Sequence, residues 1–186
     1  VRGAVVDIGM GDTDISFSWE NLFAANKAII DADADRYFFV PDAVEVTVSG
    51  APEMTAHAPV YPNKPERGER LLHFTGKVLL PRAEVEKGGM LRLKDLFNIR
   101  MTGEATAEYA GDSLADARKE KAPIIQWLPA ENAAPCSLLT PEGMQDGFAE
   151  PEVLGYAGKI VQFERVGFAK IDAVENGKAV AYHTHR

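Results

Sequence analysis

Few residues in this 186-residue chain have the types and spacing that enzyme chemistry requires. The histidines and the single cysteine do not show the spacing of a zinc site: His57, His73, His183, His185 and Cys136. The sequence also lacks a Gly-x-Gly-x-x-Gly run, a P-loop and a Gly-x-Ser-x-Gly motif. It therefore predicts neither a catalytic residue nor a metal site, and Cys136 is expected to be structural.

Acidic side chains gather in the first forty residues without forming a calcium motif. The aspartates concerned are Asp12, Asp14, Asp31, Asp33 and Asp35. They lack the spacing and the closing glutamate of an EF-hand. Helix caps and a solvated turn are therefore their expected roles.

Cationic side chains in the middle of the chain have the chemistry to hold phosphate groups. They are Arg82, Lys87, Arg92, Lys94 and Arg100. Arg92 and Lys94 are two positions apart, so on a strand both would lie on one face. Two interpretations stay open from these residues alone, a phosphate-binding face and an ordinary solvated strand face.

The overall charge counts against a polyanionic partner. Twenty basic and 28 acidic residues give a net charge of −8, which by itself argues against nucleic acid or an anionic membrane as partner. The excess acid lies at the two ends, because residues 1–40 carry −4, residues 41–100 carry +1 and residues 101–186 carry −5. A locally basic face in the middle is compatible with this distribution. No apolar run approaches the roughly 18 residues of a membrane-spanning helix.

The hydrophobic pattern changes period near residue 36 and predicts a mainly β protein. Helical spacing predicts helices near 1–8 and over 16–31. Val44, Val46 and Val48 then alternate with polar residues, which indicates a strand. Further strands are expected over Leu71–Leu80, Met90–Leu93, Phe97–Met101, Thr106–Tyr109, Ile124–Leu128, Cys136–Leu139, Lys159–Phe163, Gly167–Ile171 and Lys178–His183. About ten short strands without a long helix between them are typical of barrels or sandwiches. The proline-rich segment 51–70 is expected to be a functional loop or a connection between domains.

Four ordered blocks of sequence resemble the glutamate and glutamine class I aminoacyl-tRNA synthetases. Residues 34–42, ADRYFFVPD, are similar to the segment that enters the anticodon-binding region of that family. Residues 61–68, YPNKPERG, resemble its HPNKPE-G loop, and residues 124–128, IIQWL, resemble its IHW strand with Gln126 in place of histidine. The C-terminal run GFAEP followed by QFERVGF also matches the family. The lead-in DISFSWENL is most similar to archaeal-type glutamate enzymes.

The resemblance implies a domain organisation and a missing catalytic half. Residues 1–40 would form a helical connector at the end of the stem-contact region. Residues 41–186 would form an anticodon-binding region of two β-barrels, like that of glutaminyl-tRNA synthetase, with the C-terminal strands returning to the first barrel. The family's HIGH and KMSKS signatures for ATP do not occur here. We therefore expect a fragment, as the absence of an initiator methionine also indicates, that cannot activate an amino acid and needs no cofactor of its own. ATP and Mg would serve only the intact enzyme.

The resemblance also implies RNA-binding roles for five residues. Arg36 matches an arginine at the pocket for the middle anticodon base. Arg92 and Lys94 match arginines near the anticodon. Lys94 keeps the positive charge but lacks the planar guanidinium that forms two parallel hydrogen bonds. Arg100 belongs to the same basic segment. Asp146 stands where the glutamine enzymes read a base edge with a glutamine, and an ionised carboxylate can only accept hydrogen bonds.

An alternative for Arg36 is purely structural, an ion pair with Asp33 or Asp35. Structural roles are expected for Trp127, Glu150 and Arg165.

The function implied is the tRNA-binding, anticodon-recognising part of a glutamate–tRNA ligase acting in the cytoplasm. The expected partner is the anticodon stem and loop of tRNA, with other components of the translation machinery as further candidates. Two alternatives remain open, the same region of a glutaminyl-tRNA synthetase and a non-catalytic β-barrel that binds proteins.

Overall fold

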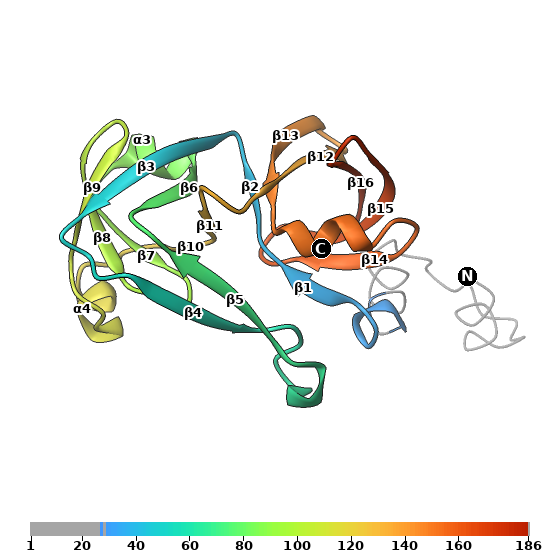
Figure 1. Cartoon of the computed structure of the whole chain (residues 1–186), viewed down its shortest axis with the longest axis horizontal. Helices are drawn as coiled ribbons and strands as arrows, with labels where there is room; N and C mark the ends of the chain where they lie inside the picture. Colours follow the sequence, from blue (N-terminus) through green and yellow to red (C-terminus); the bar gives the residue numbers. More distant parts are fainter. Residues whose placement is uncertain (1–26, 28, 186) are drawn as a thin grey trace, which may run out of the picture.

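The computed structural model describes residues 27 and 29–185, and these form two seven-stranded β-sheets side by side together with a two-stranded hairpin (Figure 1). Residues 27 and 29–31 are helical, and the helix ends at Asp31 as the sequence predicts. The rest of both predicted helices lies outside the described residues. None of the helices in the described part of the chain is long and apolar enough to cross a membrane.

The first sheet is a nearly closed barrel built from the two ends of the described chain. Its seven strands, in spatial order, are β1 (Asp35–Tyr37), β14 (Ile160–Phe163), β15 (Gly167–Glu175), β16 (Lys178–His185), β12 (Ala134–Thr140), β13 (Gly143–Ala149) and β2 (Phe39–Pro41). The edge strands β1 and β2 are consecutive in sequence, so Phe38 alone joins the two edges. Cys136 lies in the barrel interior with no exposed surface, and burial raises the pKa of its thiol to about 12. The prediction of a structural cysteine is therefore confirmed.

The second sheet is a half-barrel made from the middle of the chain. Its strands, in spatial order, are β10 (Ile124–Ile125), β7 (Met90–Leu93), β8 (Asn98–Gly103), β9 (Thr106–Tyr109), β3 (Ala43–Ser49), β6 (Lys77–Pro81) and β11 (Leu128–Pro129). A hairpin of β4 (Met54–Pro59) and β5 (Glu69–Phe74) adds Leu72 and Phe74 to its core. Besides the helical residues 27 and 29–31, the described part of the chain has four short helices: η1 (Pro65–Arg67), α3 (Arg82–Lys87), α4 (Leu114–Lys119) and η2 (Pro151–Gly155).

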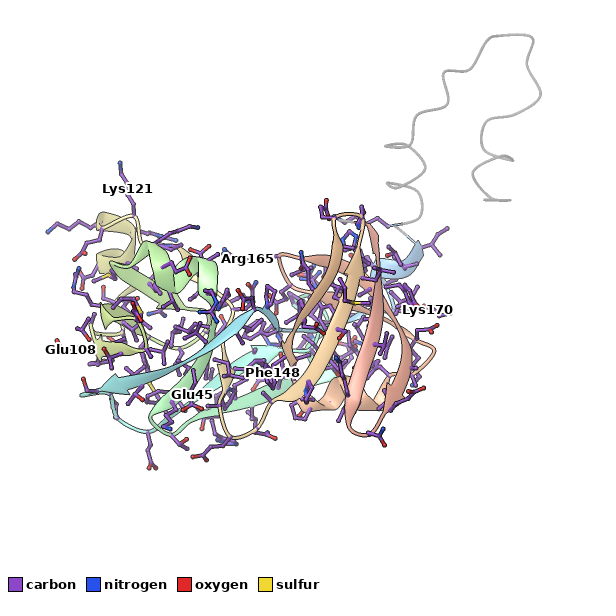
Figure 2. The ribbon with its side chains drawn as sticks, turned by 90° about the horizontal axis from the view of Figure 1, so that it is seen from above. Glu45, Glu108, Lys121, Phe148, Arg165 and Lys170 are labelled. Atoms are coloured by element: carbon purple, nitrogen blue, oxygen red, sulfur yellow. The ribbon has the colours of Figure 1, made fainter. Side chains whose placement is uncertain are left out.

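The segment that joins β1 to β2 packs against both cores at once. Tyr37 and Phe39 belong to the core of the first sheet, whereas Phe38 and Val40 belong to the core of the second. Alternate residues of an extended chain point in opposite directions, so one short run can fill two cores. Phe148 of β13 also packs against the second core and lies where the two sheets meet in Figure 2.

The mainly β architecture is confirmed, with three corrections to its details. The second of the two predicted barrels is only half closed. The strands expected over 71–80 and 124–128 are each divided in two, and the segment 51–70 contains β4 and the start of β5 besides its loop. No long helix interrupts residues 71–172. The boundary between a connector and a barrel region near residue 40 stays a prediction.

Gly147 allows β13 to pair with β2 and so to close the first sheet. Gly147 lies opposite Pro41 in the strand register. A Cβ atom at this position would collide with the carbonyl oxygen of Val40 and would lie 2.8 Å from the Cα of Pro41. Backbone atoms cannot yield by a rotamer change, so only glycine fits this close approach.

We predict that Gly147→Ala lowers the free energy of unfolding by about 3 kcal/mol, at the upper end of the usual cost of overpacking. Urea unfolding followed by circular dichroism measures this change. Gly155→Ala is the matched control, because a Cβ atom there meets nothing within 4 Å. Equal unfolding midpoints for the two variants would contradict the role of Gly147.

Candidate nucleic-acid interface

Arg36 lies on β1, and its side chain contacts an acid and an aromatic ring. Its guanidinium is 3.6 Å from the Oδ1 atom of Asp31 and 5.1 Å from the ring centroid of Tyr61. The side chain keeps 23% of its surface exposed. The alternative pairing with Asp33 or Asp35 is therefore wrong, because the helix that ends at Asp31 places that carboxylate beside β1.

Two further cations surround the ring of Tyr61. The Lys64 amine is 4.8 Å from the ring centroid, and the Arg67 guanidinium is 5.6 Å from it. Both side chains also donate to the carbonyl oxygen of Ala32, at 2.7 and 3.1 Å. Cations are favoured beside the free carbonyls that follow a helix end. We call Arg36, Tyr61, Lys64 and Arg67 the Tyr61 cluster.

Residues 61–68 resemble the family's HPNKPE-G loop, but the sequence alone predicts no RNA-binding role for their side chains. The sequence does carry a signal for such a role, because an aromatic residue is followed by two cations within seven positions. RNA-binding sites combine aromatic rings with positive charge.

Arg92 and Lys94 engage different parts of the molecule. Arg92 lies on β7 and donates to the Oδ1 atom of Asn98 at 3.2 Å and to the carbonyl of Asp112 at 2.7 Å. Lys94 follows β7, which ends at residue 93, and its amine is 2.8 Å from the Oε2 atom of Glu164. The two cations therefore have different partners, and β7 ends one residue before Lys94.

Arg100 and Asp146 are exposed residues of two different sheets. Arg100 on β8 pairs with Glu120 at 2.7 Å. Asp146 on β13 accepts hydrogen bonds from the hydroxyl of Ser137 and from the amine of Lys178, and its side chain is 74% exposed. These two donors lower the pKa of the Asp146 carboxyl. Within the described residues no hydrogen bond or ion pair joins any two of the five predicted RNA contacts.

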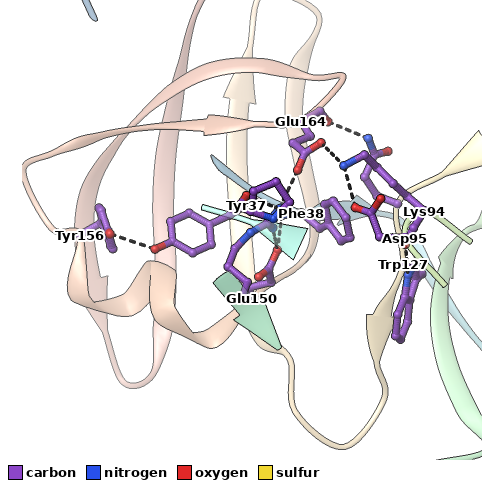
Figure 3. A network of polar contacts seen from close by, with 11 residues as sticks. Tyr37, Phe38, Lys94, Asp95, Trp127, Glu150, Tyr156 and Glu164 are labelled. Carbon is purple, nitrogen blue, oxygen red and sulfur yellow. Dashed lines mark hydrogen bonds and ion pairs between the residues drawn. The ribbon is translucent and has the colours of Figure 1, made fainter. Parts of the chain in front are cut away.

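A buried ionic network joins the two sheets (Figure 3). Arg70 on β5 is 5% exposed and donates to Glu150, which follows β13, and to Glu164 in the turn between β14 and β15, the latter at 2.7 Å. Lys94, next to β7, reaches the other oxygen of Glu164. One cation from the hairpin and one from the second sheet therefore meet two acids of the first sheet.

The network is completed by hydrogen bonds to the main chain. The amide of Phe38 donates to Glu150 at 2.6 Å, and the indole of Trp127 donates to the carbonyl of Lys94 at 3.0 Å. Gln126 donates its side-chain amide to the carbonyl of Glu164 at 3.0 Å. Trp127 and Glu150 are buried, so their expected structural roles are confirmed. Burial raises the pKa of the Glu150 carboxyl to about 7, although the guanidinium and the Phe38 amide oppose the shift.

Two segments of the chain match models of a known family. Residues 34–114 and residues 124–172 each match a model described as the anticodon-binding domain of class I tRNA synthetases (E and Q). Together the two segments cover more than two thirds of the chain. The chain belongs to this anticodon-binding family. Its buried network and the Tyr61 cluster both lie within the matched residues.

Relatives of this anticodon-binding chain are named glutamate–tRNA ligases. The chain is 77% identical over its whole length to the enzyme of Methanocorpusculum labreanum and 56% identical to that of Methanoculleus marisnigri. It is also 39% identical over its whole length to the enzyme of Pyrococcus abyssi. The chain spans about a third of the length of these relatives.

We predict that Arg70→Ala lowers the free energy of unfolding at pH 7 by about 3–5 kcal/mol, because two largely buried carboxylates lose their shared partner. Urea unfolding measures the loss. Arg100→Ala is the matched control, since its exposed pair with Glu120 is worth only about 0–1 kcal/mol. A loss in Arg70→Ala no larger than in this control would contradict the prediction.

The loss in Arg70→Ala is also expected to depend on pH. The pKa of Glu150 is above its ordinary value in the folded chain, and removing Arg70 raises it further. A raised pKa in the folded state means that folding favours the protonated Glu150 carboxyl. The contribution of Glu150 to the free energy of unfolding is therefore fully present below about pH 4.5 and is lost as pH rises through 7. Unfolding measured at pH 5 and pH 8 should show the smaller loss at pH 5, and adding Glu150→Gln should remove the difference.

Proposed function

We propose that the chain is the tRNA-binding, anticodon-recognising part of a glutamate–tRNA ligase. Its 77% identity over the whole chain to an enzyme of that name is the observation that carries the proposal. The family models include both glutamate and glutamine enzymes, and the names of the relatives favour glutamate. The intact enzyme would attach glutamate to its tRNA using ATP, in the cytoplasm and during translation.

The chemistry of the candidate interface suits an unpaired anticodon. Such bases splay outwards, stack on aromatic rings and offer their edges to polar side chains, while cations hold the phosphates. The Tyr61 cluster gathers three cations around a ring that is itself buried, so it supplies positive charge and not an open stacking face. We assign base recognition to Arg36 and phosphate contacts to Arg92, Lys94 and Arg100. Asp146 has a lowered pKa and is ionised at neutral pH, so it would accept a hydrogen bond from a base amine.

We propose that ATP and Mg²⁺ serve the intact enzyme and not this interface. Within residues 27 and 29–185, no group of three or more His, Cys, Asp or Glu side chains is placed to hold a metal ion. Both ATP and Mg²⁺ would serve a part of the enzyme that this chain does not contain.

We predict that Arg36→Ala weakens binding of the cognate tRNA by about 1–3 kcal/mol and reduces discrimination at the middle anticodon nucleotide. Arg36→Lys should restore part of the affinity but not the base preference, since lysine lacks the planar fork. Filter binding of cognate tRNA, and of a tRNA altered at that nucleotide, measures both effects.

Lys77→Ala is the matched control for Arg36→Ala, because Lys77 also pairs with a carboxylate, that of Glu45, on the surface. Equal weakening of both tRNAs by Arg36→Ala would identify a phosphate contact instead. Unchanged binding of both would leave Arg36 with only its structural pair with Asp31.

A further inference from the structure

The outer face of the first sheet carries a row of exposed apolar side chains. Met144 on β13 lies opposite Leu139 on β12, which lies opposite Tyr182 on β16, which in turn lies opposite Lys170 on β15. Directly opposed residues project from the same face of a sheet. Met144, Leu139 and Tyr182 are 54%, 38% and 42% exposed, and Lys170 is exposed as well. We call these four residues the Tyr182 row.

Exposure of this row departs from the ordinary pattern of a barrel. The neighbours Leu138, Ala181 and Ile171 point inwards and have no exposed surface, so their strands already fill the core. The outward positions of such strands are usually polar. Here three large apolar side chains stand side by side, and contiguous exposed apolar surface marks an interaction site.

The charged residues around the row favour RNA as its occupant. Lys170 has no carboxylate within ion-pair distance among the described residues, and it lies on the outer side of the barrel in Figure 2. On the same face, Lys178 is already paired with Asp146 at 3.2 Å. A free cation one strand away from an aromatic ring, at about 4.8 Å between strands, can hold the phosphate of a base that stacks on that ring.

The size of the row favours RNA over a folded protein. A standard protein interface buries about 800 Å² on each partner. The apolar part of the Tyr182 row is three side chains long and is limited by the Asp146–Lys178 pair on one side. This narrow surface fits one or two unpaired bases.

We propose that Tyr182 stacks an unpaired base of the tRNA, that Lys170 binds the adjoining phosphate, and that Leu139 and Met144 extend the stacking surface. The proposal rests on the proposed function and adds a second RNA contact to it. Because Asp146 lies two residues from Met144 on β13, its carboxylate shares the outer face with the row.

The test measures binding of the 186-residue chain to a tRNA transcript for glutamate and to a fully paired RNA duplex. Tyr182→Ala should weaken binding of the tRNA by about tenfold or more, the effect of losing one base stack, with little change for the duplex. Tyr182→Phe should bind like the wild type, because the phenyl ring still stacks. Lys170→Ala should reduce the slope of log affinity against log salt by about 1.

Two variants away from the row serve as matched controls and should leave binding unchanged. Met54→Ala removes an apolar side chain that is 38% exposed on β4, and Lys119→Ala removes an exposed cation at the end of α4. Unfolding midpoints from circular dichroism confirm that each variant is folded.

The outcomes separate this proposal from the proposed function. If the wild type binds the tRNA and Tyr182→Ala binds it equally well, the stacking role is overturned and the proposed function stands. Equal weakening of tRNA and duplex by Tyr182→Ala also overturns stacking. If Leu139→Ser abolishes a dimer seen by sedimentation and leaves tRNA affinity unchanged, the row is a protein interface. Absence of tRNA binding by the wild type would overturn both proposals.

Discussion

The buried guanidinium of Arg70 is the constraint on which the arrangement of the two sheets depends. A cation without solvent is tolerated only where carboxylates surround it with good geometry. Glu150 and Glu164 supply them, and both come from the first sheet, whereas Arg70 enters from the hairpin that packs on the second. Lys94 adds a second cation from the other side. Any sliding of one sheet against the other would separate these charges, so the network fixes their relative position.

The same hairpin carries the aromatic part of the candidate interface. Loop 61–68 connects β4 to β5, and Arg70 follows it directly at the start of β5. The network that anchors Arg70 therefore also holds the base of this loop. The tip of the loop is held by Lys64 and Arg67, which donate to the carbonyl of Ala32. Tyr61 is thus held beside Arg36 by contacts at both ends of its loop. These contacts make the candidate interface rigid.

Local pattern predicted the elements that alternate, and it failed where structure depends on distant partners. Strand β3 was readable because valines alternate with polar residues. Strand β13 was missed because its exposed first half shows no alternation, and because its glycine is required by contact with β2, about a hundred residues away. The cations of the candidate site were visible in sequence, but Glu164, the partner of Lys94, is 70 positions away. The RNA-binding roles could therefore be predicted only from the resemblance to a family. The Tyr182 row can be recognised only when the register of the strands is known.

The net charge of −8 is compatible with a polyanionic partner because charge acts locally at physiological salt. Screening limits a charge to about 8 Å, so an acidic residue on the far side of a barrel has little effect at the interface. Several acids are also neutralised by neighbouring cations, as Glu164 is by Arg70 and Lys94. Long-range attraction to tRNA should therefore be weak. Under the proposed function, affinity comes instead from short-range contacts, such as stacking and hydrogen bonds to bases.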